Sequence, residues 1–562
     1  MDLQSCGLDQ NALLDRALLD LPAFTVLRMQ SKAVRLDRSE GADMSPKAWE
    51  SVTFNLRKGQ GEVGIEDIIN VSVVYHNPIS GGRTRLWFRL ISSNDSKYKP
   101  YFEHPKIEPS TSSTATLTAA YGWFINCRLS HPRCHKPAAF KNDWLPNRLI
   151  DVGHPGSTDW KLRITSEDGV LPQSAPYATL SYRWAPNPSL VLLTSNIIEF
   201  RAGKPIETLP QLFRDVIVVT QRFSIRYIWI DALCIVQDSR EDWEAQASTM
   251  KMVYANSTCN IAASGANSPD EGLFSARNPK EIQPSLVSCS LFSSENQPHY
   301  IFEKRYWDWE IHAGLLHNRG WVFQERILPP RVLYFGKNQV LWECLTEHRC
   351  EGFPNGIPGH HSDKNIDPLF RSLSSTSLNR PQKMELSIIN LWQNLVQRYS
   401  ECALTYPSDR PFAIAGIAQL FRDATGDEYV AGLWKSRLVE MLDWRVWKPE
   451  VLQSSEYRAP SWSWASVDGP GQDPCGYYLL DNLAVELPEG KEVICMPFKK
   501  DSYKREEDFS VRSLIVCLIL EELPCPSGSQ AQYRRLGIFE EDNSEYIDIL
   551  NTRSEIKDIE IV

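Results

Sequence analysis

The sequence predicts an α/β fold in which a parallel sheet is flanked by helices. Three short apolar runs suited to strands lie at residues 177–182, 227–230 and 259–264. Segments with apolar residues at helical spacing separate these runs. Strands that alternate with helices are typical of a parallel sheet, and this pattern supports the prediction.

The first strand and the helix after it have clear boundary signals. The run at 177–182 is bounded by Pro176 and by a loop rich in proline and asparagine. Pro210 suits the first turn of a helix, where proline is tolerated. The residues expected on the buried face of this helix are Phe213, Ile217 and Thr220.

The second strand, at 227–230, is too short for a helix and is bounded by charged residues. Ser239 and Asp242 form a capping-box pattern, which predicts the start of another helix. The apolar positions expected along that helix are Trp243, Ala247, Met250 and Tyr254.

The strand ends supply the candidate binding site, because ligands of parallel sheets collect at the carboxyl ends of the strands. Trp184 could stack on a base, Arg183 could hold phosphate and Asp231 could hold a ribose hydroxyl. Alternatively, Trp184 is a wedge that fixes the loop, and Asp231 caps the loop or pairs with Arg183 or Arg226. The predicted ligand-binding residues beside Asp231 are Ser181, Tyr182, Arg183, Trp184, Cys234, Gln237 and Asp238.

This stretch resembles the fungal heterokaryon incompatibility (HET) domain family. The likeness rests on YATLSYRW (177–184), YIWIDALCIVQD (227–238) and RGWVFQERILPPRVLYF (319–335), and it covers roughly residues 118–470. The resemblance implies a TIR-like core and a role in non-self recognition and regulated cell death. It also implies self-association or other incompatibility proteins as partners. Because some TIR domains cleave NAD, it implies NAD as a substrate.

A carboxylate near the ribose is needed for such cleavage, because the reaction passes through an oxocarbenium-like centre. Many HET sequences carry an acid where this chain has Gln246, which cannot ionise. The candidate catalytic acids are therefore Glu244, on another helix face, Glu325 and Asp231. Glu325 has neighbouring arginines and could instead belong to a structural Arg–Glu network.

Two other functions stay open beside cell-death signalling. One is an enzyme of fungal secondary metabolism that converts a small molecule in the strand-end pocket. The other is a non-catalytic, oligomerising interaction module. A nucleophilic role for Cys234 is not favoured, because no histidine flanks it and a buried thiol is usually inert.

Cys127, His131 and Cys134 have a spacing that a zinc ion could use. A closed zinc site needs four ligands, and the adjacent His135 would be awkward to aim at the same ion as Cys134. We therefore favour a helix end with packed or hydrogen-bonded side chains and assign no metal.

Composition excludes several classes of protein. A net charge of −10 argues against a nonspecific nucleic-acid binder, which would carry a basic face. No run approaches the roughly 20 apolar residues of a membrane helix. The N-terminus has no basic region typical of a secretory signal, and the 13 scattered cysteines suggest a reducing compartment, so we expect a cytoplasmic protein.

We expect β-rich N-terminal and α+β C-terminal regions around the α/β core. A hairpin should turn at 78–82, a helix should cover 384–400, and a terminal sheet should include strands at 461–467 and 481–487. The predicted divisions are a β-rich region at 1–117 with a linker at 108–118, the HET α/β domain with its lead-in at 118–345, a helical region at 346–453 and a β-rich region at 454–562.

Overall fold

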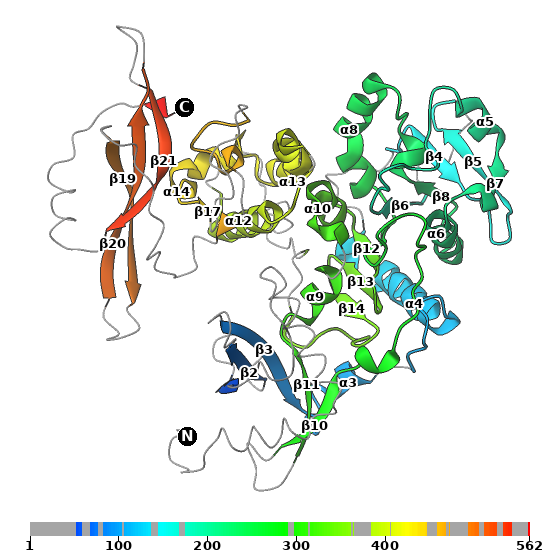
Figure 1. Cartoon of the computed structure of the whole chain (residues 1–562), viewed down its shortest axis with the longest axis horizontal. Helices are drawn as coiled ribbons and strands as arrows, with labels where there is room; N and C mark the ends of the chain where they lie inside the picture. Colours follow the sequence, from blue (N-terminus) through cyan, green and yellow to red (C-terminus); the bar gives the residue numbers. More distant parts are fainter. Residues whose placement is uncertain are drawn as a thin grey trace. The chain divides into compact units, whose positions relative to one another are not determined.

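The computed structural model contains two compact units (Figure 1). The first is Met1–His317 with Pro329–Asn365, and the second is Asn318–Leu328 with Ile366–Val562. The predicted turn at 78–82 and strand at 481–487 lie outside the described residues. The structure describes residues 52–58, 68–76, 83–103, 106–135, 144–167, 175–289, 297–312, 315–360, 364, 384–404, 406–446, 458–467, 471–472, 493–504, 511–524, 532–541 and 560–561.

A nine-stranded mixed sheet forms the core of the first unit. Its four central strands, β12, β9, β6 and β8, run parallel, and the strands on both flanks pair antiparallel. The predicted α/β fold is therefore confirmed, although the sheet is mixed rather than parallel throughout. In sheet order the strands are β14 (His348–Cys350), β13 (Val340–Cys344), β12 (Arg331–Phe335), β9 (Cys259–Ala262), β6 (Tyr177–Ser181), β8 (Tyr227–Trp229), β4 (Arg148–Asp151), β5 (Asp159–Ile164) and β7 (Lys204–Pro205).

Helices cover both faces of this sheet. Strands β6, β8 and β9 are buried at every residue, as expected of strands enclosed on both faces. Tyr177 donates its hydroxyl to the carbonyl of Val253 in α8 (Arg240–Ala255) at 2.6 Å, whereas the Tyr182 ring packs on Phe213 in α6 (Gln211–Arg222). Successive residues of a strand point to opposite faces, so α8 and α6 lie on opposite sides of β6 (Figure 1).

The local predictions for these helices are mostly correct. The buried face of α6 contains Phe213, Ile217 and Thr220, as expected. Ser239 caps α8 by accepting from the Asp242 N–H at 3.2 Å. Trp243 lies on α8 as expected, but it is 47% exposed, and the buried side of α8 includes Gln246, Val253 and Tyr254.

The order of the parallel strands predicts where along their carboxyl ends a ligand binds.

 Numbered by their order in the chain, β6, β8, β9 and β12 are parallel strands 1, 2, 3 and 4. Across the sheet they lie in the order β8, β6, β9, β12, which is the order 2-1-3-4. This is one of the two common orders of doubly wound sheets. In such sheets, ligands bind where the direction of strand addition reverses, which is here the carboxyl ends of β6 and β9.

An antiparallel sheet forms a second part of the first unit. Strands from the N-terminal region share it with two strands from a much later segment. Its strands are β1 (Val52–Lys58), β2 (Ile69–His76), β3 (Arg83–Ser92), β11 (Gln297–Glu303) and β10 (Ser285–Cys289). The other helices of this unit are α3 (Lys99–Phe102), α4 (Thr114–Ser130), α5 (Ile197–Ala202), α7 (Asp231–Cys234) and α9 (Tyr306–His312).

Helix α4 begins at Thr114 and is capped by Ser113, whose hydroxyl accepts from the Thr116 N–H at 3.2 Å. The second half of the segment expected as a linker, 108–118, is therefore helical.

Among the described helices of the chain, none combines the length and the apolar character needed to cross a membrane.

The second unit contains a four-stranded sheet, in the order β19-β20-β21-β22, and helices that surround a cluster of aromatic residues. The Trp392 ring lies 5.3 Å from the Trp434 ring and 5.1 Å from the Phe421 ring. The predicted strand at 461–467 is instead a turn with a 3₁₀ helix at Trp464–Ser466, which Ser463 caps. The elements are α10 (Gly320–Ile327), α12 (Leu386–Ser400), α13 (Arg410–Thr425), α14 (Leu438–Met441), β15 (Tyr429–Val430), β16 (Leu433–Trp434), β17 (Arg445–Val446), β18 (Gly471–Gln472), β19 (Val493–Lys504), β20 (Val511–Glu522), β21 (Gln532–Glu541) and β22 (Glu560–Ile561).

Candidate functional site

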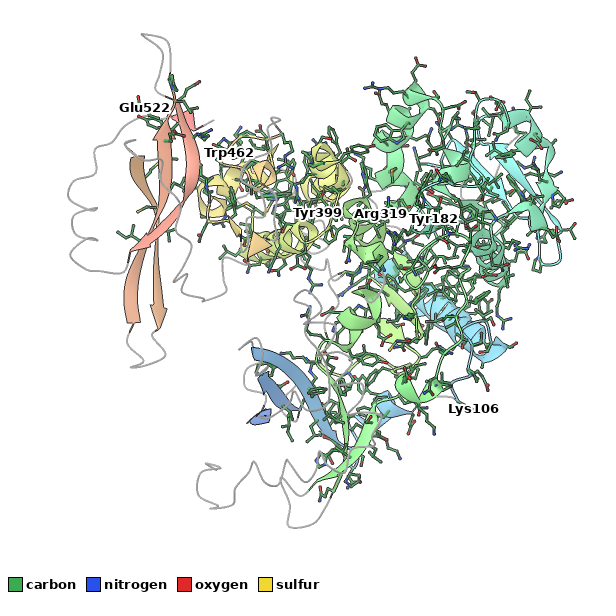
Figure 2. The ribbon with its side chains drawn as sticks, in the orientation of Figure 1. Lys106, Tyr182, Arg319, Tyr399, Trp462 and Glu522 are labelled. Atoms are coloured by element: carbon green, nitrogen blue, oxygen red, sulfur yellow. The ribbon has the colours of Figure 1, made fainter. Side chains whose placement is uncertain are left out.

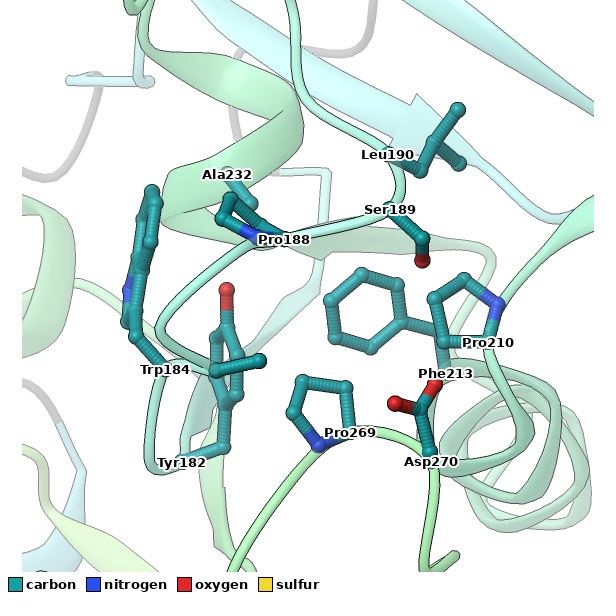
Figure 3. A pocket seen from close by; sticks show the side chains of 11 residues that line it. Tyr182, Trp184, Pro188, Ser189, Leu190, Pro210, Phe213, Ala232, Pro269 and Asp270 are labelled. Carbon is teal, nitrogen blue, oxygen red and sulfur yellow. The ribbon is translucent and has the colours of Figure 1, made fainter.

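A shallow hollow, open to solvent, lies beside the carboxyl ends of the parallel strands. Figure 3 shows Tyr182 and Trp184 on one side of it and Pro210, Phe213 and Asp270 on the other. The walls come from the loops after β6, β8 and β9 and from the start of α6. This is the edge at which the strand order predicts a ligand.

The walls of the hollow are mainly apolar, with a few polar groups. Tyr182 is buried and stacks on Trp184, with the ring centroids 6.3 Å apart and the planes 15° apart. Figure 2 marks Tyr182 within the first unit. Ser189 and Asp270 add a hydroxyl and a carboxylate to the lining. A mainly apolar pocket with a few polar groups is the usual form of a small-molecule site.

Trp184 and Asp231 join the two segments that were predicted to form the site. The Trp184 indole Nε1–H donates to Asp231 Oδ2 at 2.6 Å, and the Ala232 N–H donates to Asp231 Oδ1 at 2.7 Å. Asp231 therefore orients Trp184 and starts the short helix α7. The alternative partner, Arg226, binds Asp151 instead, at 2.8 and 2.9 Å.

Arg183 lies between Tyr182 and Trp184 in the sequence and is partly exposed, but it does not line the hollow. Its guanidinium makes no hydrogen bond, ion pair or ring contact with the residues that the structure describes. A guanidinium with its donors available can bind an anion such as phosphate.

Ser181 and Cys234 lie inside the fold rather than on the walls of the hollow. The Asn260 amide donates to Ser181 Oγ at 2.9 Å, and both side chains are buried. Cys234 is fully buried, and this burial raises the pKa of its thiol to about 12. The thiolate that a nucleophile requires is therefore scarce at neutral pH.

Gln237 and Asp238 fasten the loops around the hollow. The Gln237 amide donates to the carbonyls of Asp231 and Ile235, at 3.2 and 2.9 Å. Asp238 accepts from the hydroxyl and the backbone N–H of Thr194, and these hydrogen bonds lower the pKa of its carboxyl. Gln237 thus holds the turn after β8 in place, and Asp238 ties the loop after β6 to it.

Glu244 and Glu325 do not line the hollow. Glu244 is exposed on α8 and pairs with Arg240 one turn earlier, at 2.8 Å. Glu325 is buried in α10, which belongs to the second unit. Arg331, which lies six positions after Glu325 in the sequence, donates to Cys127 Sγ at 3.2 Å and to the carbonyl of Thr258 at 3.3 Å.

Asp270 is a candidate residue that the sequence reasoning did not identify. It lies in the loop after β9, and Pro269 beside it also lines the hollow. The strand-end rule was applied to the first two strands only. Applied to the third as well, it would have pointed to this loop.

A buried serine–histidine pair is a second contact without a local sequence signal. Ser264 follows β9, and its Oγ lies 2.7 Å from His317 Nε2. Ser264 is 1% exposed and His317 is 6% exposed. Because a substrate could not reach this pair without displacing its surroundings, we interpret it as a brace for the end of β9.

The structure gathers Cys127, His131 and Cys134 around a fourth residue, Cys344 at the end of β13. Their ligating atoms all lie within 4.8 Å of one another. His135, the awkward neighbour in sequence, is exposed and has no part in this cluster. These four side chains are the ones that could hold a metal ion among the described residues.

Comparison with known proteins identifies the central segment. Residues 177–325 match the family model described as "Heterokaryon incompatibility protein (HET)". No curated protein and no solved structure matched the chain. The matched segment includes β6, β8 and β9 and most of the hollow described above. The comparison therefore shows that residues 177–325 are similar to the heterokaryon incompatibility domain family.

Proposed function

We propose that this protein acts in fungal non-self recognition and regulated cell death by binding and cleaving NAD in the strand-end hollow. The HET match supports a heterokaryon-incompatibility-type role. The observation that carries the biochemical proposal is the hollow itself, which opens where the order of the parallel strands reverses. The same 2-1-3-4 order supports a TIR-like core.

The lining of the hollow suits a nucleotide. Tyr182 and Trp184 offer aromatic surface on which a planar ring can stack. Arg183, which lies between them in the sequence but does not line the hollow, supplies a cation for a phosphate that extends beyond it. Asp231 fixes the Trp184 indole by the 2.6 Å hydrogen bond and is therefore a positioning residue.

Asp270 is the carboxylate that we assign to the chemistry. Among the described residues, it is the only acid that lines the hollow. In NAD hydrolysis, the bond between ribose C1′ and the nicotinamide nitrogen breaks, and its electron pair leaves with neutral nicotinamide. Water then bonds to C1′ and releases a proton, which gives ADP-ribose. A carboxylate beside the ribose stabilises the positive charge that develops at C1′.

The test is NAD turnover by the purified full-length chain, with nicotinamide release followed by chromatography. Asp270→Asn keeps the shape of the side chain but removes its charge, and we expect it to lower kcat by about 100-fold or more. Glu199→Gln is the matched control, because Glu199 is an exposed acid on α5. We expect this control to keep wild-type activity.

The outcomes separate the three functions. No NAD loss by the wild-type chain at concentrations that allow self-association, measured by light scattering, would exclude NAD cleavage. Oligomers without turnover would then favour the interaction module. A new product in metabolite profiles of expressing cells, lost with Asp231→Ala while NAD stays constant, would favour the small-molecule enzyme.

A further inference from the structure

The cluster of Cys127, His131, Cys134 and Cys344, called here the Cys3His cluster, combines two distant parts of the chain. Cys127 lies in the last turn of α4, His131 is its C-cap, and Cys134 ends the 3₁₀ helix Pro132–Cys134. Cys344 ends β13, and it lies 213 positions after His131. The three cysteines are free and at most 1% exposed, and the His131 side chain is 11% exposed.

The spacing of the ligand atoms matches a tetrahedral zinc site. Zinc binds sulfur at about 2.3 Å and imidazole nitrogen at about 2.0–2.1 Å, so tetrahedral geometry separates the two ligand atoms by about 3.5 Å. Cys344 Sγ lies 3.5 Å from His131 Nδ1. All four ligand atoms fall within 4.8 Å of one another, so all four side chains are gathered at one place in the fold.

The surroundings of the cluster also suit a bound zinc ion. The second ring nitrogen of His131, Nε2, lies 3.6 Å from Glu347 Oε2, and such a carboxylate orients a ligating imidazole. The Glu347 N–H donates to Cys344 Sγ at 3.4 Å, and Arg331 Nε donates to Cys127 Sγ at 3.2 Å. Hydrogen bonds of this kind stabilise thiolate rather than thiol.

Charge balance favours the same conclusion. Three thiolates, a neutral imidazole and Zn²⁺ carry a net charge of about −1. The guanidinium of Arg331, in contact with the cluster, compensates this charge. A soft, sulfur-rich set of ligands excludes calcium and magnesium, which take oxygen ligands.

We propose that the Cys3His cluster is a structural zinc site that ties the end of helix α4 to strand β13. Because four protein ligands complete the tetrahedron, no position remains for a substrate or an activated water. The ion holds together segments that otherwise meet through side-chain packing, such as Phe124 of α4 on Trp342 of β13. This proposal is independent of NAD cleavage.

The test is the metal content of the full-length chain, purified under reducing conditions from cells supplied with zinc and measured by inductively coupled plasma mass spectrometry. We expect about one zinc per chain in the wild type. Cys344→Ser and Cys127→Ser should each lose most of it. Cys350→Ser is the matched control, because Cys350 is equally buried on the neighbouring strand β14 but lies outside the cluster.

Two further measurements keep the test decisive if a ligand variant fails to fold. Cobalt-substituted wild-type protein should show the visible and thiolate charge-transfer absorption of a tetrahedral, thiolate-rich site. Titration with an organomercurial should release the zinc as the cluster thiols react. Wild-type protein without zinc, with iron in its place, or with a disulfide between two of these cysteines would overturn the proposal. So would retention of zinc by Cys344→Ser at the level of the Cys350→Ser control.

Discussion

The hydrogen bond between Trp184 and Asp231 can be tested by a double-mutant cycle. Trp184→Phe removes the indole donor and keeps an aromatic ring against Tyr182. Asp231→Ala removes the acceptor. If the bond fixes the wall of the hollow, the two substitutions must be energetically coupled.

The size of the coupling follows from the contact. A hydrogen bond to a charged group contributes about 1.5–3 kcal/mol. The bond is short, at 2.6 Å, but both side chains are only partly buried, so we expect the lower end of this range. About 1.5 kcal/mol corresponds to roughly a tenfold change in an equilibrium constant.

Hydrogen exchange followed by mass spectrometry provides the assay. The amides of α7, Asp231–Cys234, report the local opening that follows when the bond is lost. Each single variant should raise the exchange rate of these amides. The fold increase in the double variant should be about ten times smaller than the two single fold increases multiplied together. Trp243→Phe is the control, since this tryptophan is 47% exposed and its replacement should leave α7 unchanged.

Additive effects would refute the reasoning. If the coupling is below about 0.5 kcal/mol, the two residues act independently, and Asp231 cannot be the group that orients Trp184. In that case NAD binding should respond to Trp184→Phe but not to Asp231→Ala.

Three other predictions concern acid stability, backbone strain and thiol reactivity. Burial alone would raise the pKa of Asp151, but hydrogen bonds from Arg226 and a backbone N–H outweigh it and lower the pKa. The stabilisation is present above the unfolded pKa of about 3.9 and is lost as pH falls through the folded pKa. Urea midpoints of wild type should therefore fall more steeply below about pH 4 than those of Asp151→Asn; parallel curves contradict this. Gly432→Ala should destabilise the second unit by about 1–3 kcal/mol in urea unfolding, because its φ is +100° and a Cβ would lie 2.6 Å from Trp464 Nε1; an unchanged midpoint contradicts this. Cys234, with a thiol pKa raised to about 12 by burial, should resist iodoacetamide in the native protein, and rapid alkylation would reopen the nucleophile hypothesis.

Local structure could be predicted from the sequence because its signals are local. The apolar runs gave β6 and β8 to within one residue, and the Ser239 cap marked the start of α8. The exposure of Trp243, at 47%, was not foreseen, because the sequence shows that a residue is apolar but not which distant segments cover it.

The antiparallel flanks of the sheet and the fourth cluster residue could not be predicted in the same way. Strand β4 joins β8 through Ile150 and Asp151, and nothing in either short run encodes that pairing. Cys344 lies 213 positions from His131. The local motif of Cys127, His131 and Cys134 therefore contained only three of the four residues of the cluster. Such contacts arise from the topology of the whole sheet, and a local motif cannot contain them.

Hydrogen bonds between its loops hold the walls of the hollow in place. The Leu192 N–H donates to the Ala232 carbonyl at 2.8 Å, and the Leu192 carbonyl accepts from the Gln237 N–H at 2.9 Å. Thr194 adds two hydrogen bonds to Asp238. These bonds fasten the loop after β6 to the segment after β8 through its backbone, so a ligand meets walls that are already ordered. If the proposed NAD site is correct, binding costs little conformational entropy, substitutions at Asp238 should weaken NAD binding through loop order, and Asp270→Asn should lower kcat instead.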